Sequence, residues 1–329
     1  MTLIKQKKEK SMKIGVVGPG AMGCLLAGRI AQAGNEVLLL DHLLERFKII
    51  KQRGVTIVGL QENLRIKIPI TLNPTDLLAS ELILICVKAY DTQNVARVLG
   101  NIPDGPSILT LQNGVGNVEI LGEFLPKEKI IAGITSHGAT DLGFGQVRHA
   151  GQGDTFIGYG FPEVETDPNQ DLQLNRVKFL LDKAGFITQL VPKIENLIWS
   201  KLLINIGINA LTALTRLKNG RIVEFSGTKE ILEEAVQEGI KVGKKKGIEF
   251  IYSDPLSQVK KVCQLTDANI SSMLQDVLKE KKTEIDFLNG VIVREGQKHG
   301  ISVPTNALLT RLVKTIEESY KQTVSIKED

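Results

Sequence analysis

Residues 18–23 read GPGAMG, and this glycine-rich turn lies between the apolar run KIGVVG (13–18) and a stretch of helix-forming residues. Gly18 permits a tight turn, Gly20 lets the backbone approach a pyrophosphate, and Gly23 lets the helix pack closely on the strand. The other residues of the turn are Pro19, Ala21 and Met22. A helix that begins here directs its free N–H groups and the positive end of its dipole at the phosphates. The spacing therefore predicts a strand–turn–helix unit that binds a dinucleotide.

An acidic residue ends the next apolar run, EVLLLD (36–41), 23 residues after Gly18. At this place in a dinucleotide-binding unit, the carboxylate of Asp41 would accept hydrogen bonds from the ribose hydroxyls. It would also repel the 2′-phosphate that distinguishes NADP from NAD. His42 and Arg46 follow closely and could weaken this repulsion. We therefore expect Asp41 and His42 at the cofactor ribose, and the sequence favours NAD(H) over NADP(H).

The first half of the chain alternates short apolar runs with helical stretches. Continuous apolar strands separated by helices are typical of a parallel sheet that is covered on both faces. Residues 13–192 are therefore predicted to form an α/β domain, a Rossmann-type doubly wound parallel sheet, and residues 1–12 a basic, flexible tail. The further strands are expected at ELILICVKA (81–89), SILTLQNG (107–114) and IIAGITS (130–136), with TFIGYG (155–160) and FITQLV (186–191) near the edge of the sheet.

After Pro192 the periodicity of the apolar residues becomes helical, and residues 193–329 are predicted to form an all-helical domain. The segment 271–300 reads as two helices. Thr283 and Asp286 have the spacing of a capped helix start, and Gly300 is expected to end that helix.

One helix of the second half, WSKLLINIGINALTAL (199–214), is apolar almost all round except for a single polar row. Lys201, Asn205 and Asn209 recur every four residues and so lie on one face, with Thr212 close to the same angle. A helix that is apolar on nearly every side is a buried one, and a buried lysine shifts its pKa readily. The pattern favours a row that faces a cleft over one that forms an exposed seam.

The composition narrows the possible partners. The chain has 329 residues and a net charge of +4, with 42% hydrophobic and 24% charged residues, which fits a globular protein of two domains. The balanced charge argues against nucleic acid, and no apolar run has the length of a membrane span or a signal peptide. The cysteines, Cys24, Cys86 and Cys263, form neither a disulfide pattern nor a metal-ligand pattern. We therefore expect a cytoplasmic protein without a metal site. Of the histidines, His137 and His149 are assigned to loops.

Seven motifs follow one another along residues 13–315: GPGAMG, CVKAYDT, LQNGVGN, GITSHGA, WSKLLINIGINALTAL, KNG and NISSMLQDVLKEKKTEIDFLNG. Together they resemble the ketopantoate reductase family, the 2-dehydropantoate 2-reductases. The resemblance implies an N-terminal Rossmann domain and a C-terminal helical domain that holds the substrate and the catalytic residues, with the active site in the cleft between them. It also implies reduction of ketopantoate to (R)-pantoate, usually by NADPH, on the route to pantothenate and coenzyme A.

Matching these motifs residue by residue implies roles for particular side chains. Lys201 corresponds to the catalytic lysine, which protonates the carbonyl oxygen as hydride reaches the carbon; an ammonium also stabilises the charge that develops there. Glu284 matches a catalytic glutamate that contacts the cofactor and helps to keep the lysine charged. The substrate-binding residues implied by the resemblance are Lys201, Asn205, Asn209, Asn219, Asn269 and Ser272. The further cofactor-binding residues, expected in the first domain, are Lys88, Asn113 and Ala139.

This chain departs from the family after the second strand, where NADPH-dependent members favour a basic residue and this sequence has Asp41 and His42. An alternative is therefore an NAD-dependent D-2-hydroxyacid dehydrogenase of the mandelate type, from the same family. A third hypothesis is a non-catalytic NAD(H)-binding sensor, which would have little need of Lys201 and Glu284. The expected partner is a small 2-keto acid. The sequence does not decide whether the protein forms a homodimer, because an apolar helix face suits a core and a dimer interface equally well.

Overall fold

The computed structural model describes residues 11–60, 62–101, 105–161 and 168–322. The predicted tail over residues 1–12 therefore lies almost entirely outside the described residues. The chain divides into two compact units. The first unit comprises Met1–Gln112 and Asn117–Ile194, and the second comprises Asn113–Gly116 and Glu195–Asp329.

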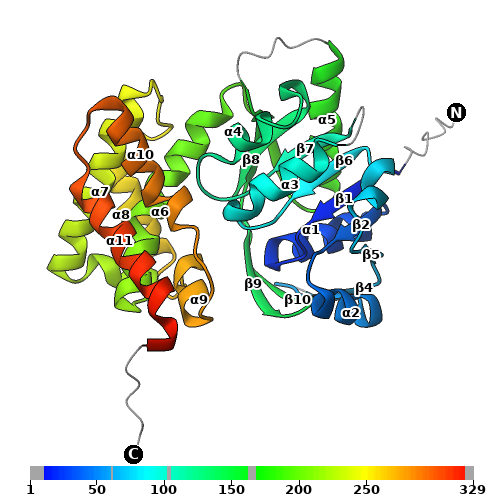
Figure 1. Ribbon diagram of the computed structural model, residues 1–329, viewed down its shortest axis with the longest axis horizontal. Helices are drawn as coiled ribbons and strands as arrows, with labels where there is room; N and C mark the ends of the chain where they lie inside the picture. Colours follow the sequence, from blue (N-terminus) through cyan, green and yellow to red (C-terminus); the bar gives the residue numbers. More distant parts are fainter. Residues whose placement is uncertain (1–10, 61, 102–104, 162–167, 323–329) are drawn as a thin grey trace, which may run out of the picture. The chain divides into compact units, whose positions relative to one another are not determined.

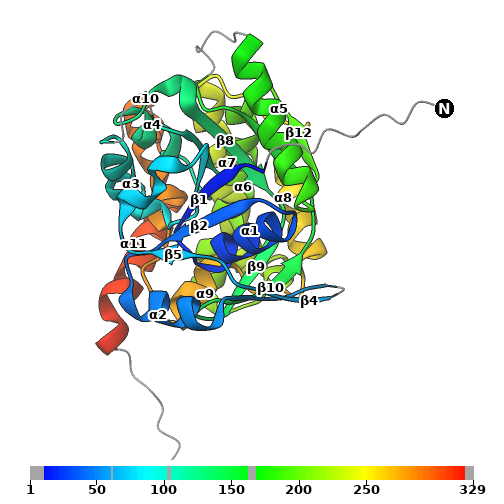
Figure 2. The same ribbon diagram turned by 90° about the vertical axis from the view of Figure 1, so that its right-hand side faces the viewer.

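An eight-stranded sheet forms the centre of the first unit, in the order β12-β11-β8-β7-β6-β1-β2-β5 (Figures 1 and 2). Its strands are β1 (Lys13–Val17), β2 (Glu36–Leu40), β5 (Ile70–Thr71), β6 (Leu82–Ile85), β7 (Ser107–Thr110), β8 (Ile130–Thr135), β11 (Thr155–Tyr159) and β12 (Thr188–Leu190). Between β8 and β5 in this order, each pair of adjacent strands is parallel. The two predicted edge strands are present, but β11 runs antiparallel to β8, so the sheet is mixed. The reason is that the described segment 136–154 contains no helix, and a parallel return needs a long crossover, usually helical.

Helices cover both faces of this sheet. In β6, Leu82 and Leu84 belong to one hydrophobic cluster, whereas Ile83 and Ile85 belong to another. Because successive side chains of a strand point to opposite faces, both faces of the strand are buried. The first cluster includes residues of α1 (Ala21–Gln32) and α5 (Pro168–Lys183), and the second includes residues of α3 (Thr92–Leu99) and α4 (Asn117–Gly122). The α/β, doubly wound fold class is confirmed.

The sequence did not predict a second, four-stranded sheet in this unit. Its strands are β3 (Val55–Val58), β4 (Asn63–Ile66), β9 (Gly138–Gly143) and β10 (Gln146–Gly151), in the order β4-β3-β10-β9. It packs against α1, where a Cβ added at Gly28 would lie 2.6 Å from Cδ1 of Ile57 (Figure 2). The remaining elements of the unit are α2 (Leu44–Arg53) and the 3₁₀ turns η1 (Pro74–Ala79), η2 (Ala89–Asp91) and η3 (Lys127–Lys129).

The second unit is helical, with no strand in the described segment 195–322. Its helices are α6 (Ile194–Thr215), α7 (Ser226–Lys245), α8 (Pro255–Leu265), α9 (Ser272–Leu278), α10 (Asn289–His299) and α11 (Pro304–Ser319), with the 3₁₀ turns η4 (Asn219–Val223), η5 (Ile285–Phe287) and η6 (Tyr320–Gln322) (Figure 1). No residue from Ile194 to Leu214 is exposed. In the described part of the chain, α6 is the one helix long and apolar enough to cross a membrane, but 72% of its apolar window is buried inside the protein. It is therefore a core helix.

The second helix of the segment 271–300 begins later than the sequence predicts. Oγ1 of Thr283 accepts the N–H of Ile285 at 3.2 Å, but this contact opens only the turn η5. The carboxylate of Asp286 pairs instead with Lys314 at 2.7 Å, and α10 starts at Asn289. The predicted end is confirmed, because Gly300 follows the helix in the left-handed conformation with φ 68°.

Candidate functional site

The glycine-rich turn between β1 and α1 has a distinct reason for each glycine. Gly18 has φ +91°, and a Cβ added there would lie 2.8 Å from the backbone N of Val87. A Cβ added at Gly23 would lie 2.2 Å from the carbonyl oxygen of Gly18. At Gly20, by contrast, an added Cβ would meet nothing within 4 Å. Gly18 and Gly23 are therefore required by the fold, whereas Gly20 leaves space beside the turn.

The start of α1 suits an anion. Its N-cap, Gly20, makes no side-chain capping bond, and its first turn carries no acidic residue. The N–H groups of a first helical turn have no partner within the helix, and they point at whatever lies beyond its positive end. Behind the turn, Sγ of the buried Cys24 donates to the carbonyl oxygen of Pro19 at 3.2 Å, and burial raises the pKa of this thiol to about 12. The turn, including Ala21 and Met22, therefore fits a pyrophosphate and has no charged thiolate beside it.

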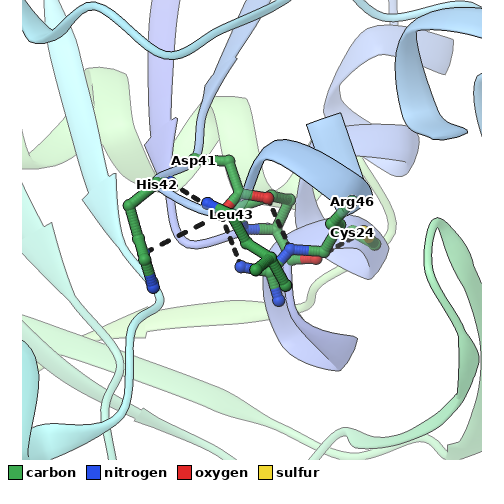
Figure 3. Close-up of polar contacts among 6 residues, drawn as sticks. Cys24, Asp41, His42, Leu43 and Arg46 are labelled. Atoms are coloured by element: carbon green, nitrogen blue, oxygen red, sulfur yellow. Dashed lines mark hydrogen bonds and ion pairs between the residues drawn. The ribbon is translucent and has the colours of Figure 1, made fainter. Parts of the chain in front are cut away.

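The carboxylate of Asp41 is bound to Arg46 (Figure 3). Nε of Arg46 donates to Oδ2 at 2.5 Å, and Nη2 donates to Oδ1 at 2.6 Å. The backbone N–H groups of His42 and Leu43 donate to Oδ1 at 2.8 and 3.1 Å. The side chain of Asp41 is 0% exposed, whereas that of Arg46 is 19% and that of His42 is 83% exposed. The expectation of NAD(H) relied on an accessible carboxylate, and this carboxylate is covered.

Lys88 and Ala139 occupy different surroundings. Lys88 is half-buried, follows the carboxyl end of β6 and precedes η2. Because β6 pairs in parallel with β1, Lys88 and the glycine-rich turn lie at the same edge of the sheet. Ala139 is half-buried in β9 and lies opposite His149 of β10. The assignment of His149 to a loop is thus wrong.

His137 and His149 are both buried, and Nδ1 of His137 lies 2.9 Å from Nε2 of His149. Burial lowers the pKa of each imidazole, with the neighbouring His149 adding to the effect at His137 and Arg29 adding to it at His149. The pair is therefore neutral at physiological pH and supports the small sheet beside Ala139.

Gln112 is a residue of this edge that the sequence did not single out. Its Nε2 donates to the carbonyl oxygen of Val87 at 2.8 Å and to Oγ1 of Thr92 at 2.9 Å. The side chain thereby ties the segment after β7 to the segment after β6, next to Lys88. Gln112 belongs to the motif LQNG, but no spacing rule predicts these contacts for a glutamine that precedes a turn.

The structure groups Asn113 with the second unit, although the sequence placed it in the first domain. The N–H of Val115 donates to the carbonyl oxygen of Phe287 at 3.0 Å. Gly114 has φ +84°, and a Cβ added there would lie 2.4 Å from the same oxygen. The short segment Asn113–Gly116 therefore packs as part of the helical unit.

The polar row of α6 becomes more buried along the helix. Lys201 and Asn205 are half-buried, Asn209 is 7% exposed and Thr212 is fully covered. Burial lowers the pKa of Lys201 to about 8, and the carboxylate of Glu284, itself buried, acts in the opposite direction. Lys201 is therefore mostly charged near neutral pH but releases its proton far more easily than a solvated lysine.

Hydrogen bonds connect this row to the start of α9. The hydroxyl of Thr212 donates to the carbonyl oxygen of Asn209 at 2.9 Å and lies 2.6 Å from Oγ of Ser271. Ser271 is the N-cap of α9 and accepts the N–H of Leu274 at 3.1 Å. Ser272, the next residue, is exposed at the first position of α9. Two buried hydroxyls thus connect the backbone of Asn209 to Ser271, the residue that precedes Ser272 in the chain.

Asn219 and Asn269 are also linked. The N–H of Asn219 donates to the carbonyl oxygen of Asn269 at 3.0 Å, and Nδ2 of Asn219 donates to Oγ1 of Thr266 at 3.0 Å. Oδ1 of Asn219 is buried and has no hydrogen-bond partner within the described residues. An acceptor left unsatisfied in this way costs free energy that a ligand hydroxyl would recover. The side chain of Asn269 is exposed.

A glycine-rich turn that opens a helix on a doubly wound sheet, together with a lysine of lowered pKa in a helical unit, is the combination expected of an NAD(P)-dependent oxidoreductase. Residues 14–160 match the family described as ketopantoate reductase PanE/ApbA, and residues 193–317 match its C-terminal region. The chain belongs to the ketopantoate reductase family, as the motifs indicated.

Individual relatives and structures agree with this membership. The chain is 36% identical to a 2-dehydropantoate 2-reductase of Archaeoglobus fulgidus over 93% of this chain and 98% of the relative. It is 34% identical to one of Halobacterium salinarum over 92% of this chain and 98% of the relative. A ketopantoate reductase structure from Ralstonia eutropha matches with a TM-score of 0.85 and 29% identity, covering 94% of this chain and all of that one. D-Mandelate dehydrogenase with NADH and anilino(oxo)acetate matches with a TM-score of 0.86 and 27% identity, with the same coverage.

Proposed function

We propose that this protein is a 2-dehydropantoate 2-reductase, which reduces ketopantoate to (R)-pantoate for pantothenate and coenzyme A synthesis. The observation that carries the proposal is the half-buried Lys201, whose pKa falls to about 8 and which shares its helix face with Asn205 and Asn209. A general acid is most effective when its pKa lies near the working pH. The relatives named 2-dehydropantoate 2-reductase support the choice of substrate.

In this proposal the reduced nicotinamide of NADPH or NADH supplies the hydride, and the chain supplies the proton. Lys201 donates its Nζ proton to the keto oxygen as the C=O π bond breaks, so the alkoxide is neutralised where it forms. The amine of Lys201 then regains a proton from solvent. Glu284 favours the ammonium before the reaction and contacts the cofactor. The turn over residues 18–23, with Lys88, Asn113 and Ala139, holds the dinucleotide.

The remaining polar residues bind the substrate. Asn205 and Asn209 hold the keto acid beside Lys201, while Asn219, Asn269 and Ser272 take its carboxylate and hydroxyl groups. Support comes from the buried Oδ1 of Asn219, which accepts no hydrogen bond from the described residues and would accept one from a substrate hydroxyl. The proposal also places the protein in the cytoplasm. A homodimer stays a hypothesis, which a measurement of the molar mass by light scattering would test.

The pH dependence of reduction follows from Lys201. We expect kcat/KM to fall as the pH rises through about 8, because only the protonated lysine can donate. Since Glu284 raises the pKa of Lys201, the Glu284→Gln variant should move this descending limb to lower pH. A pH–rate profile of both proteins measures this. A profile that stays flat through the titration of Lys201, or a shift to higher pH in Glu284→Gln, would contradict the assignment.

The match to D-mandelate dehydrogenase favours a second candidate, an NAD-dependent D-2-hydroxyacid dehydrogenase. Steady-state kcat/KM for ketopantoate and for benzoylformate, each with NADPH and with NADH, separates the two. We expect ketopantoate to be preferred by at least about tenfold, since about 1.4 kcal/mol of pocket complementarity gives this ratio. A preference for benzoylformate would transfer the protein to the hydroxyacid dehydrogenases while keeping the role of Lys201.

A further inference from the structure

Thr92, the first residue of α3, joins two later segments of the first unit through its hydroxyl. Oγ1 of Thr92 accepts a proton from Nε2 of Gln112 at 2.9 Å and donates its own proton to Oδ1 of Asn117 at 2.8 Å. Thr92 is completely buried, so the loss of its hydroxyl would leave buried groups unsatisfied. The start of a helix therefore holds residues that lie 20 and 25 positions further along the chain.

The chemistry of the partners fixes the direction of each hydrogen bond. Nε2 of Gln112 also donates to the carbonyl oxygen of Val87 at 2.8 Å, and because a carbonyl only accepts, the amide must face it with its nitrogen. Oε1 of Gln112 then accepts the hydroxyl of Thr110 at 2.9 Å. The single proton of the Thr92 hydroxyl goes to Asn117. These donors and acceptors are matched in one arrangement only, and we refer to Thr92, Thr110, Gln112 and Asn117 as the Thr92 network.

The Thr92 network lies directly beside residues that the proposal assigns to the dinucleotide. Lys88 follows Val87, whose carbonyl oxygen receives the bond from Gln112, and Asn113 follows Gln112 itself. Val87 also lies against the glycine-rich turn, since a Cβ added at Gly18 would be 2.8 Å from the backbone N of Val87. A shift of the Gln112 amide would therefore be passed to the backbone that carries these binding residues.

The same network holds both ends of the segment Asn113–Gly116. Gln112 and Asn117 are the residues of the first unit on either side of this segment, which groups with the second unit. The hydroxyl of Thr92 is bonded to both of them. Within the segment, Gly114 has φ +84°, and glycine restricts the backbone least of all residues. The position of the segment therefore depends on how its ends are held.

We infer that Thr92 is a positioning residue for the dinucleotide site. Its hydroxyl orients the amide of Gln112, which in turn fixes the carbonyl of Val87. The backbone that carries Lys88 and Asn113 is thereby held before the ligand arrives, and this lowers the cost of ordering it on binding. The inference deepens the proposed function and rests on it only in requiring that the first unit binds a dinucleotide.

The test compares Thr92→Val, which keeps the shape of the side chain but removes the hydroxyl, with Thr92→Ser, which keeps the hydroxyl. Calorimetry with the full chain would measure Kd for NADPH and for NADH. We expect Thr92→Val to weaken binding of both by about tenfold, the net contribution of one buried hydrogen bond, because the ligand must then order the segments itself. Thr92→Ser should stay within about twofold of wild type, since it retains both bonds.

Thr188→Val is the matched control for the loss of a buried threonine hydroxyl. Oγ1 of Thr188 donates to the carbonyl oxygen of Phe186 at 2.6 Å, and the residue is buried in β12, the edge strand of the large sheet. Thermal denaturation would measure the stability of each variant. Thr188→Val should lose stability without a change in Kd. Equal losses of affinity in the two valine variants would make Thr92 a merely structural residue and overturn the inference.

A double-mutant cycle with Gln112→Leu tests whether Thr92 acts through Gln112. Gln112 is only half-buried, so this variant also tests the network if Thr92→Val does not fold, and it should raise both Kd values by about tenfold or more. The loss in the double variant should be smaller than the product of the single losses, because both changes break the same hydrogen bond. Multiplicative losses, or unchanged binding by either single variant, would contradict the inference.

The binding measurements separate this inference from the proposed function. A protein whose dinucleotide affinity depends on Thr92 but which does not reduce ketopantoate would refute the proposed function alone. Normal dinucleotide binding by Thr92→Val, with ketopantoate reduced, would refute the inference alone. Failure of wild type to bind either dinucleotide would refute both.

Discussion

Replacing Lys201 with alanine should lower kcat for ketopantoate reduction about 100-fold or more, the usual contribution of a general acid, while dinucleotide affinity changes little. The effect should be large because no proton donor of matched pKa would remain at the keto oxygen, and the charge that stabilises the developing alkoxide would also be lost. Lys201→Arg should not rescue turnover, since a guanidinium keeps its proton at any working pH.

Circular dichroism should accompany the kinetics of Lys201→Ala, because two effects on stability oppose each other. Removing the ammonium removes a desolvation cost, but it also takes a positive charge away from the buried carboxylate of Glu284. Lys241→Ala, at an exposed position of α7, is the matched control and should retain wild-type turnover. Near-normal kcat in Lys201→Ala would remove the residue from the mechanism, and equal losses in both variants would point to a general effect of removing positive charge.

Gly20→Val should weaken dinucleotide binding about 10- to 100-fold or more, as expected when a charge-assisted backbone contact to a phosphate is lost. The protein has room for the new side chain, because a Cβ at Gly20 would meet nothing within 4 Å. That space is the one the pyrophosphate is expected to occupy, so the variant should fold normally and bind poorly. Fluorescence titration with NADPH and NADH, with circular dichroism to check folding, measures both properties.

The control for this variant is Gly227→Val. Gly227 lies near the start of α7 and, like Gly20, has no atom within 4 Å of an added Cβ. It should leave dinucleotide affinity unchanged. Undiminished binding by Gly20→Val would mean that the pyrophosphate does not approach this turn.

The central sheet was predictable because its strands are buried on both faces. The residues Leu82–Ile85 are apolar at every position, and side chains of alternate residues belong to different hydrophobic clusters, so the run is continuous in the sequence. The smaller sheet left no such signal. In β10, QVRHAG, buried and exposed positions alternate as in any half-buried strand, but the buried His149 is polar and the exposed Ala150 is apolar, so the residue types do not show that alternation.

The candidate site was predictable to the extent that it depends on periodicity within one element. The spacing of Lys201, Asn205 and Asn209 correctly predicts a helix with few exposed residues. The pairing of Asp41 with Arg46 depends on how the backbone passes from β2 into α2, and no spacing rule supplies that path. The contact between Val115 and Phe287, which groups Asn113 with the helical unit, joins residues too distant in sequence for any local pattern. The roles assigned to the site residues stay predictions.

The most direct test of the central claim is chemical identification of the product. The purified protein would be incubated with ketopantoate and either NADPH or NADH, and chiral chromatography would identify the pantoate formed while absorbance follows oxidation of the nicotinamide. We expect (R)-pantoate in equal amount to the oxidised nicotinamide. Dinucleotide binding without formation of pantoate would contradict the account, and if benzoylformate were not reduced either, the result would favour a non-catalytic sensor.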